Sequence, residues 1–219
     1  MLSRLAALLV PAVGRLTVSA DDGAALAPGS LLVANHTSVT DPAVVLAALR
    51  RLGAQPVVMA AAGLWRAPVL GRALERDGYI PVHRGDRRAA HALDLAAAAL
   101  GEGRLLLVYA EGGIPARADA GEAAPRAFRS GVARLVERTG APVVPVGQAG
   151  ARRISSGGAA KQVAGVLTAP LRRPALHVHV GAPLTLSGGR AAATRRAHSA
   201  VTEAWRTAAA AVRSDRRAR

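Results

Sequence analysis

One stretch constrains the fold of this chain more than any other, because it joins an apolar run, a polar turn and a helical pattern. Residues 31–34 read LLVA, residues 35–41 read NHTSVTD, and an apolar helical pattern follows from 42 to 52. Aspartate is a favoured N-cap, proline suits the first helical position and Gly53 can end the helix. We therefore expect a buried strand, a turn and a helix capped by Asp41. Ligands of open α/β sheets bind beyond the carboxyl ends of strands, so the turn is a candidate site.

Apolar runs and helical patterns alternate along the rest of the chain. Short apolar runs predict further strands at residues 56–60, 79–83, 104–110, 143–147, 162–168 and 175–180. Helical patterns fall at residues 63–77, 87–100, 128–139 and 190–212. This alternation predicts one α/β domain with a central, mostly parallel or mixed β-sheet flanked by helices. Pro81 lacks a backbone donor, so its strand is expected at an edge of the sheet.

The first 18 residues combine a basic start with an apolar middle. Spanning a bilayer takes roughly 20 apolar residues, whereas Arg4 and Arg15 are separated by about 16 Å of helix and Pro11 interrupts the run. No clear cleavage site of a signal peptide follows. Two interpretations remain open: an amphipathic helix in a membrane interface, or an ordinary packing helix. On the first, residues 1–20 form a membrane-associating amphipathic helix and residues 21–219 the α/β domain.

The net charge of the chain limits the classes of molecule that it is expected to bind. The formal net charge is +15, and Lys161 is the one lysine among 29 basic residues. Such a surface attracts anionic lipid, nucleic acid or phosphorylated substrates, although scattered arginines can also reflect a coding bias. Two Trp, two Tyr and one Phe offer few stacking platforms, which argues against nucleic acid. The chain has no cysteine, which excludes a disulfide framework and a thiolate zinc site.

His36 and Asp41 are candidates for a base and its orienting partner. On one continuous helix, residues five apart lie about 140° from each other and do not meet. Pro42 changes this, because the residue before a proline is pushed out of the α region. In a turn, the Asp41 carboxylate could accept the Nδ1 proton of His36 and leave Nε2 free to take a proton from a substrate. The plainer alternative is that Asp41 only caps the helix and His36 only ends the strand.

Two other strand ends carry charge. Arg84 follows the strand at 79–83 with further arginines close behind, and an arginine fork suits phosphate, although a solvated cluster is the alternative. Glu111 ends another strand, beside Gly112 and Gly113, which permit a close backbone approach. Its carboxylate could hold a hydroxyl or an arginine, or it could be an exposed loop acid.

The remaining motifs exclude several classes of site. His177 and His179 share one face of a strand, with no cysteine and no nearby carboxylate in the sequence, so no metal site is expected there. The chain contains neither a G-x-G-x-x-G dinucleotide motif nor a P-loop. It also lacks the G-x-S-x-G elbow of serine hydrolases.

The polar turn resembles the N-H-x-x-x-x-D signature of the glycerophospholipid acyltransferases, in particular the bacterial 1-acylglycerol-3-phosphate acyltransferases. Further blocks follow in the order of that family: GYIPVHR at 78–84, YAEGG at 109–113, FRSG at 128–131 and VVPV at 143–146. They are similar to an apolar run ending in arginine, a glutamate–glycine block, an F-K-x-G stretch and an apolar pair around proline. The resemblance covers roughly residues 25 to 185.

The resemblance implies a glycerol-3-phosphate acyltransferase-like fold and an O-acyltransferase. A fatty acyl group would pass from acyl-CoA or acyl carrier protein to the free hydroxyl of a lysophospholipid, foremost 1-acylglycerol 3-phosphate, with no cofactor and no metal. It implies His36 as the general base and Asp41 as its orienting partner. The implied substrate-binding residues are Asn35, Arg84, Glu111, Gly112, Gly113, Arg129 and Pro145.

The resemblance further implies where the protein works in the cell. One of the sequence blocks, however, differs from the pattern of the family. We expect a peripheral protein at the cytoplasmic face of the cell membrane, in contact with anionic lipid, with residues 21–219 as the acyltransferase domain. The family's proline, threonine and arginine of the third block are replaced by Ala110, Gly113 and Ile114, and Arg117 could supply the missing charge. The alternative is therefore an acyltransferase-like lipid-binding protein with an atypical acceptor or no activity. No nucleic-acid partner is expected, and the oligomeric state is left open.

Overall fold

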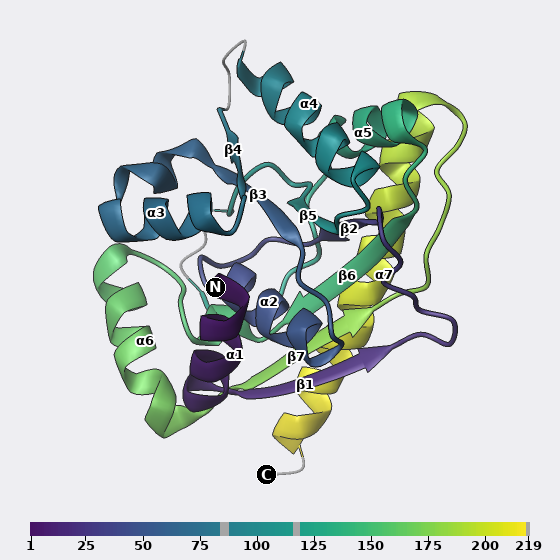
Figure 1. Cartoon of the computed structure of the whole chain (residues 1–219). Helices are drawn as coiled ribbons and strands as arrows, with labels where there is room; N and C mark the ends of the chain where they lie inside the picture. Colours follow the sequence, from purple (N-terminus) through teal and green to yellow (C-terminus); the bar gives the residue numbers. More distant parts are fainter. Residues whose placement is uncertain (84–87, 116–118, 218–219) are drawn as a thin grey trace.

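Seven strands form one mixed sheet in the computed structural model, which describes residues 1–83, 88–115 and 119–217 (Figure 1). They are β1 (Arg15–Ala20), β2 (Leu31–Ala34), β3 (Val57–Ala61), β4 (Ile80–Val82), β5 (Leu106–Tyr109), β6 (Val143–Ala149) and β7 (Ala175–Val180). Their order is β1-β7-β6-β2-β5-β3-β4, which places β4 at an edge as expected. The strands from β6 to β4 are parallel, whereas β7 runs antiparallel to β6 and pairs in parallel with β1.

Helices cover both faces of the sheet (Figure 1). On one face pack α1 (Leu2–Val13) and α2 (Asp41–Arg51), and on the other α4 (Arg88–Gly101), α5 (Gly131–Thr139) and α7 (Gly189–Arg217). The short helices that follow the carboxyl ends of β3 and β6 are η1 (Ala62–Arg66), α3 (Pro68–Arg76), η2 (Ala151–Arg153) and α6 (Ala159–Arg172). The predicted α/β architecture is therefore confirmed.

The central strand β2 is buried on both of its faces. Leu32 and Ala34 belong to the apolar cluster under α1 and α2, whereas Leu31 and Val33 belong to the cluster under α4, α5 and α7. All four side chains are fully buried. A strand covered on both faces has no polar positions to alternate with, which explains why its sequence is a continuous apolar run.

Residues 162–168 are helical, and the strand predicted there is wrong. They lie within α6, which begins after Gly158 and continues to Arg172. A short apolar run does not by itself distinguish a strand from a helix. Here the small residue Gly165 lets the helix lie against the chain, because a Cβ at this position would lie 2.3 Å from the carbonyl oxygen of Ile154. The apolar residues of the run instead face outward.

The N-terminal helix is shorter than predicted, and residue 20 is not a boundary. α1 ends at Val13, Gly14 is extended, and β1 then joins the sheet beside β7. The inner side of α1 packs on α2, so the segment is in part a packing helix. Within the described residues, no helix combines the length and apolar character needed to cross a bilayer.

A ladder of hydrogen bonds joins β1 to β7 and includes a carboxylate that the sequence did not suggest. Thr17 Oγ1 lies 2.7 Å from His177 Nδ1, and Ser19 Oγ lies 2.8 Å from His177 Nε2 and 2.9 Å from His179 Nδ1. His179 Nε2 lies 3.0 Å from Asp21 Oδ1. When both rings are neutral, the hydrogen bonds can all point the same way. Thr17 then donates to His177, His177 to Ser19, Ser19 to His179, and His179 to Asp21.

We predict that acid weakens the fold through this ladder. Burial, and the neighbouring His179, lower the pKa of His177 below its ordinary value of 6.5. The unfolded chain therefore takes up a proton more readily than the folded chain, so stability is complete above the ordinary histidine pKa and is lost as the pH falls below it. Urea unfolding at about pH 7.5 and about pH 5.5 should show this loss. The loss should shrink in His177→Asn, and an equal loss in that variant would contradict the assignment.

Candidate active site

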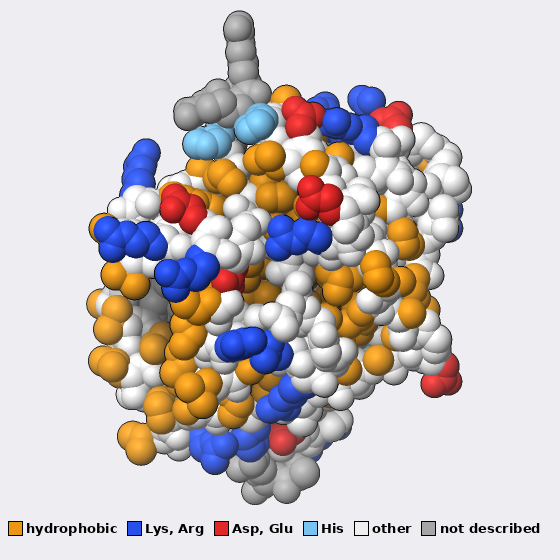
Figure 2. All heavy atoms as spheres, viewed as in Figure 1, with side chains coloured by type: hydrophobic (Ala, Val, Ile, Leu, Met, Phe, Trp, Pro, Cys, Tyr) orange, Lys and Arg blue, Asp and Glu red, His pale blue; other side chains and the backbone are white. Residues whose placement is uncertain are grey.

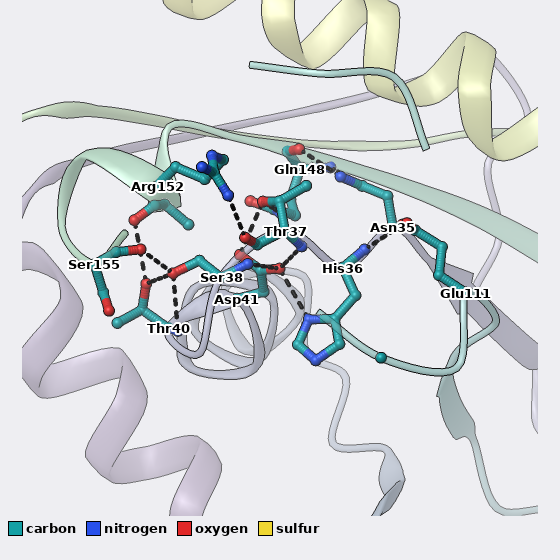
Figure 3. A network of polar contacts seen from close by, with 12 residues as sticks. Asn35, His36, Thr37, Ser38, Thr40, Asp41, Glu111, Gln148, Arg152 and Ser155 are labelled. Atoms are coloured by element: carbon teal, nitrogen blue, oxygen red, sulfur yellow. Dashed lines mark hydrogen bonds and ion pairs between the residues drawn. The ribbon is translucent and has the colours of Figure 1, made fainter. Parts of the chain in front are cut away.

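The polar turn at residues 35–41 lies at the carboxyl end of β2, where this strand leads into α2 (Figure 3). Because β2 lies between β5 and β6, the ends of both neighbours border the turn. Glu111 lies just after β5 and Gln148 near the carboxyl end of β6, so residues far apart in the sequence converge here. This is the edge of the sheet at which the sequence predicted a site.

His36 and Asp41 are brought together by the turn. His36 Nδ1 lies 3.0 Å from Asp41 Oδ2. The Asp41 side chain is fully buried, and that of His36 is 13% exposed. Nε2 of His36 has no hydrogen-bond partner in the described part of the chain, so it is the ring atom left for a ligand. The predicted contact is therefore present, whereas the catalytic roles stay predictions.

Asp41 does not cap its helix in the manner the sequence suggested. Thr40 holds the N-cap position and makes no side-chain capping bond, while Asp41 is the first residue of α2. The carboxylate of Asp41 turns back and accepts the backbone N–H groups of Thr37 and Ser38. Asp41 therefore closes the turn on itself. It does so as a residue of α2, so the expectation that Pro42 keeps it out of the helical region is wrong.

Tyr109, the last residue of β5, forms an apolar support for the histidine. The rings of His36 and Tyr109 lie 4.4 Å apart between centroids at a tilt of 32°. Burial, reinforced by the nearby charge of Asp41, holds the pKa of Tyr109 well above its usual value. The phenol therefore stays neutral beside His36.

Glu111 holds the turn and is buried, so the exposed-acid alternative is wrong. Its Oε1 accepts the backbone N–H of His36 at 2.8 Å. Its Oε2 accepts the backbone N–H of Arg126 at 3.1 Å and lies 3.5 Å from Arg126 Nε. Arg126 also donates from Nη2 to the Gly113 carbonyl at 2.7 Å. Of the two partners that the sequence suggested, an arginine or a substrate hydroxyl, the arginine is present.

Asn35 follows β2 directly and Pro145 lies within β6, and the expected contact of both with substrate stays a prediction. Asn35 is fully buried, and its amide donates to the Gln148 carbonyl at 3.0 Å and accepts the Gln148 N–H at 2.8 Å. Pro145 is an interior residue of β6 opposite Val33. Both residues therefore shape the site by joining β2 to β6.

Gly112 of the third block leaves room for an arginine side chain. Gly112 has a φ of +73°, and a Cβ there would lie 2.4 Å from Arg129 Nε. The exposed Arg129 side chain therefore crosses the backbone at Gly112, and its guanidinium has no hydrogen-bond partner among the described residues. Arg84 and Arg117 lie outside the described residues.

Gln148 and Arg152 were missed in the sequence, and both fix the turn. Gln148 Nε2 donates to Thr37 Oγ1 at 3.1 Å, and the 2% exposed Arg152 donates from Nη1 to the Thr37 carbonyl at 2.9 Å. A third contact joins Ser38 Oγ to the Ser155 carbonyl at 2.7 Å. The one available signal was their position directly after a predicted strand, which does not identify the partners.

A small cavity opens beside the turn. Its volume is about 110 Å³, and its walls come from the turn and from the segments after β5 and β6: Thr37, Glu111, Pro115, Ala123, Ala124, Arg126 and Arg152. Glu122 lies in one of these segments and accepts the Gly150 N–H at 2.9 Å. Burial raises the pKa of the Glu122 carboxyl, an effect that this hydrogen bond opposes.

Among the described residues, no group of three or more potential ligands could hold a metal ion.

Comparison with known proteins agrees with this geometry. A family model described as Acyltransferase matches residues 15–148, more than half of the chain. The chain belongs to the acyltransferase family. Its structure is similar to the crystal structure of the 1-acyl-sn-glycerophosphate (LPA) acyltransferase PlsC from Thermotoga maritima, with a TM-score of 0.74 and 17% sequence identity over 94% of this chain and 77% of that one. At this identity the likeness establishes the fold, and no curated protein matches the chain significantly.

We predict that Asn35→Ala destabilises this acyltransferase. The substitution leaves the buried N–H and carbonyl of Gln148 without partners, which costs about 1–3 kcal/mol of unfolding free energy. Chemical denaturation measures the loss. The matched control is Thr168→Ala, which removes an exposed side-chain hydrogen bond on α6 and should change stability by less than about 0.5 kcal/mol. Equal stabilities of the two variants would contradict the assigned role of Asn35.

Proposed function

We propose that this acyltransferase moves a fatty acyl group from acyl-CoA or acyl carrier protein to the free hydroxyl of 1-acylglycerol 3-phosphate, forming phosphatidic acid. The observation that carries the proposal is the contact between His36 Nδ1 and the buried Asp41 carboxylate, which leaves Nε2 available. The structurally similar PlsC is a 1-acyl-sn-glycerophosphate acyltransferase, which supports the choice of acceptor.

The proposed reaction needs no enzyme nucleophile. Nε2 of His36 takes the proton of the acceptor hydroxyl as its oxygen attacks the thioester carbonyl carbon, and the resulting imidazolium is stabilised by Asp41. The tetrahedral intermediate then collapses, the C–S bond breaks, and the thiolate takes the proton back from Nε2. His36 and Asp41 end the cycle as they began it.

Arg129 is our candidate for holding the phosphate of the acceptor. Its side chain crosses Gly112 beside the turn, is exposed, and lacks a hydrogen-bond partner among the described residues. Guanidinium groups bind phosphate through two parallel hydrogen bonds. We assign the same role to Arg84 on the sequence resemblance alone.

We further propose that the protein works at the cytoplasmic face of the cell membrane as a peripheral protein, because both the acceptor and the product are lipids. The outer side of α1 supports this, since Leu8 is 72% exposed and Leu9 is 59% exposed. Because the inner side of α1 packs on α2, this helix would bind lipid while remaining attached to the domain.

The second candidate function is a lipid-binding relative with an atypical acceptor or no activity. The replaced residues Gly113 and Ile114 are the observation that favours it, because the family's arginine is missing there. Release of free thiol from acyl-CoA in the presence of a panel of lysophospholipids distinguishes the two: thiol release that depends on an acceptor supports the enzyme.

We predict that His36→Ala lowers kcat/KM by about 10²–10⁴, because the acceptor hydroxyl loses its base. Asp41→Asn should also lower kcat, because the imidazolium loses its counter-charge. Thiol release measures both effects, and unfolding curves check that the variants are folded. His91→Ala, an exposed histidine on α4, is the control and should behave as the wild type. Wild-type turnover in His36→Ala would exclude the mechanism.

We predict that Arg129→Ala raises the KM for the phosphate-bearing acceptor by about tenfold or more, the expected loss of a charge-assisted contact. The KM for the acyl donor should change little. The control is Arg134→Ala, which removes an exposed arginine of α5 and lowers the net charge equally. Equal increases for acceptor and donor, or for both variants, would remove the phosphate role of Arg129.

A further inference from the structure

α6 is attached to the domain by one narrow side. Gln162 is half-buried, Gly165 allows close contact with the Ile154 carbonyl, and Ala169 is the fully buried residue of the helix. These positions are three and four residues apart, so they form a single stripe along the helix. The opposite side of α6 is therefore turned away from the domain.

The outer side of α6 is apolar. Val163 is 60% exposed, Val166 42%, Leu167 73% and Leu171 90%. Their spacing of three, one and four residues places them on one broad face of the helix. A surface helix normally presents polar side chains on its outer face, so this face has the composition of a contact surface.

The apolar face continues onto α1. The two helices contact each other and lie side by side in Figure 1. α1 exposes Leu5, Leu8 and Leu9 at helical spacing. Figure 2 shows hydrophobic side chains gathered over this side of the molecule, with basic side chains between them. The two outer faces thus form a common surface, which we call the α1–α6 surface.

The two helices of this surface carry basic residues and no acidic ones. No aspartate or glutamate occurs between Glu137 and Glu203 or before Asp21, so neither helix carries an acidic residue. α6 carries two exposed cations, Lys161 and Arg172, and the Arg172 guanidinium donates to the backbone carbonyls of Arg153 and Gly165. An apolar face bordered by cations is typical of helices that lie in the interface of an anionic bilayer.

We propose that the outer face of α6 binds the surface of an anionic lipid bilayer, as a second lipid contact beside α1. The inference rests on the proposed function, which requires lipid substrates. A second copy of this chain is the less favourable occupant, because a two-fold interface would place the cations of both copies against each other. Lipid headgroups instead neutralise them.

Vesicle flotation of full-length protein tests the proposal. The probes are vesicles of phosphatidylcholine with phosphatidylglycerol and vesicles of phosphatidylcholine alone, and the variants are Leu167→Asp and Leu171→Asp. We expect each to weaken binding to the anionic vesicles by about tenfold, through loss of an inserted apolar group. The matched control is Leu95→Asp, which makes the same change at a 38% exposed leucine of α4 on the opposite side of the sheet.

Three results would overturn the proposal: unchanged binding of both variants, an equal loss in Leu95→Asp, or a dimer in light scattering that Leu167→Asp dissociates. Because both leucines are exposed, unfolding midpoints equal to the control are expected. Thiol release with a short-chain, monomeric acceptor separates this proposal from the proposed function. If the leucine variants float less than the wild type but turn over the monomeric acceptor normally, α6 is supported as a lipid contact. If they float less but neither the wild type nor the variants release thiol, only the proposed function is contradicted.

Discussion

The buried carboxylate of Asp41 is the group on which the site depends. A carboxylate removed from water is costly unless its oxygens are paired. Here Oδ2 accepts the backbone N–H groups of Thr37 and Ser38 and faces Nδ1 of His36, while Oδ1 accepts the hydroxyl of Thr37 at 3.4 Å. The first turn of α2 adds its partial positive charge. Stabilising the carboxylate therefore requires the turn to close, and the closed turn places the imidazole.

Neighbouring strands hold this closed turn through its backbone. Glu111, after β5, accepts the N–H of His36, and Arg152, after β6, donates to the carbonyl of Thr37. Next to the turn, the Asn35 side chain links the end of β2 to β6 through the backbone of Gln148. Residues after the two neighbouring strands thus fix the backbone of the turn from both sides. The Nε2 atom of His36 remains available to react.

The sequence predicted those features of the fold and site that depend on residues close together in the chain. The strand, turn and helix from Leu31 to Arg51 and the contact of His36 with Asp41 follow from residues within the same stretch, although Asp41 lies inside the helix and not before it. The contact of Glu111 with His36 and the contacts of Gln148 and Arg152 with Thr37 join parts of the chain that only the sheet order brings together. α6 was mistaken for a strand because its apolar residues face outward, where hydrophobic patterning no longer reports a core.

The state of the His36 ring tests the account most directly. If Asp41 accepts the Nδ1 proton, neutral His36 carries its hydrogen on Nδ1 and leaves Nε2 unprotonated. ¹⁵N NMR of histidine-labelled protein resolves the two ring nitrogens, and the signals absent from His36→Gln assign them. We predict an Nδ1–H tautomer in the wild-type protein and a mixture of tautomers in Asp41→Asn. A wild-type His36 with its proton on Nε2 would contradict the proposed role of the pair.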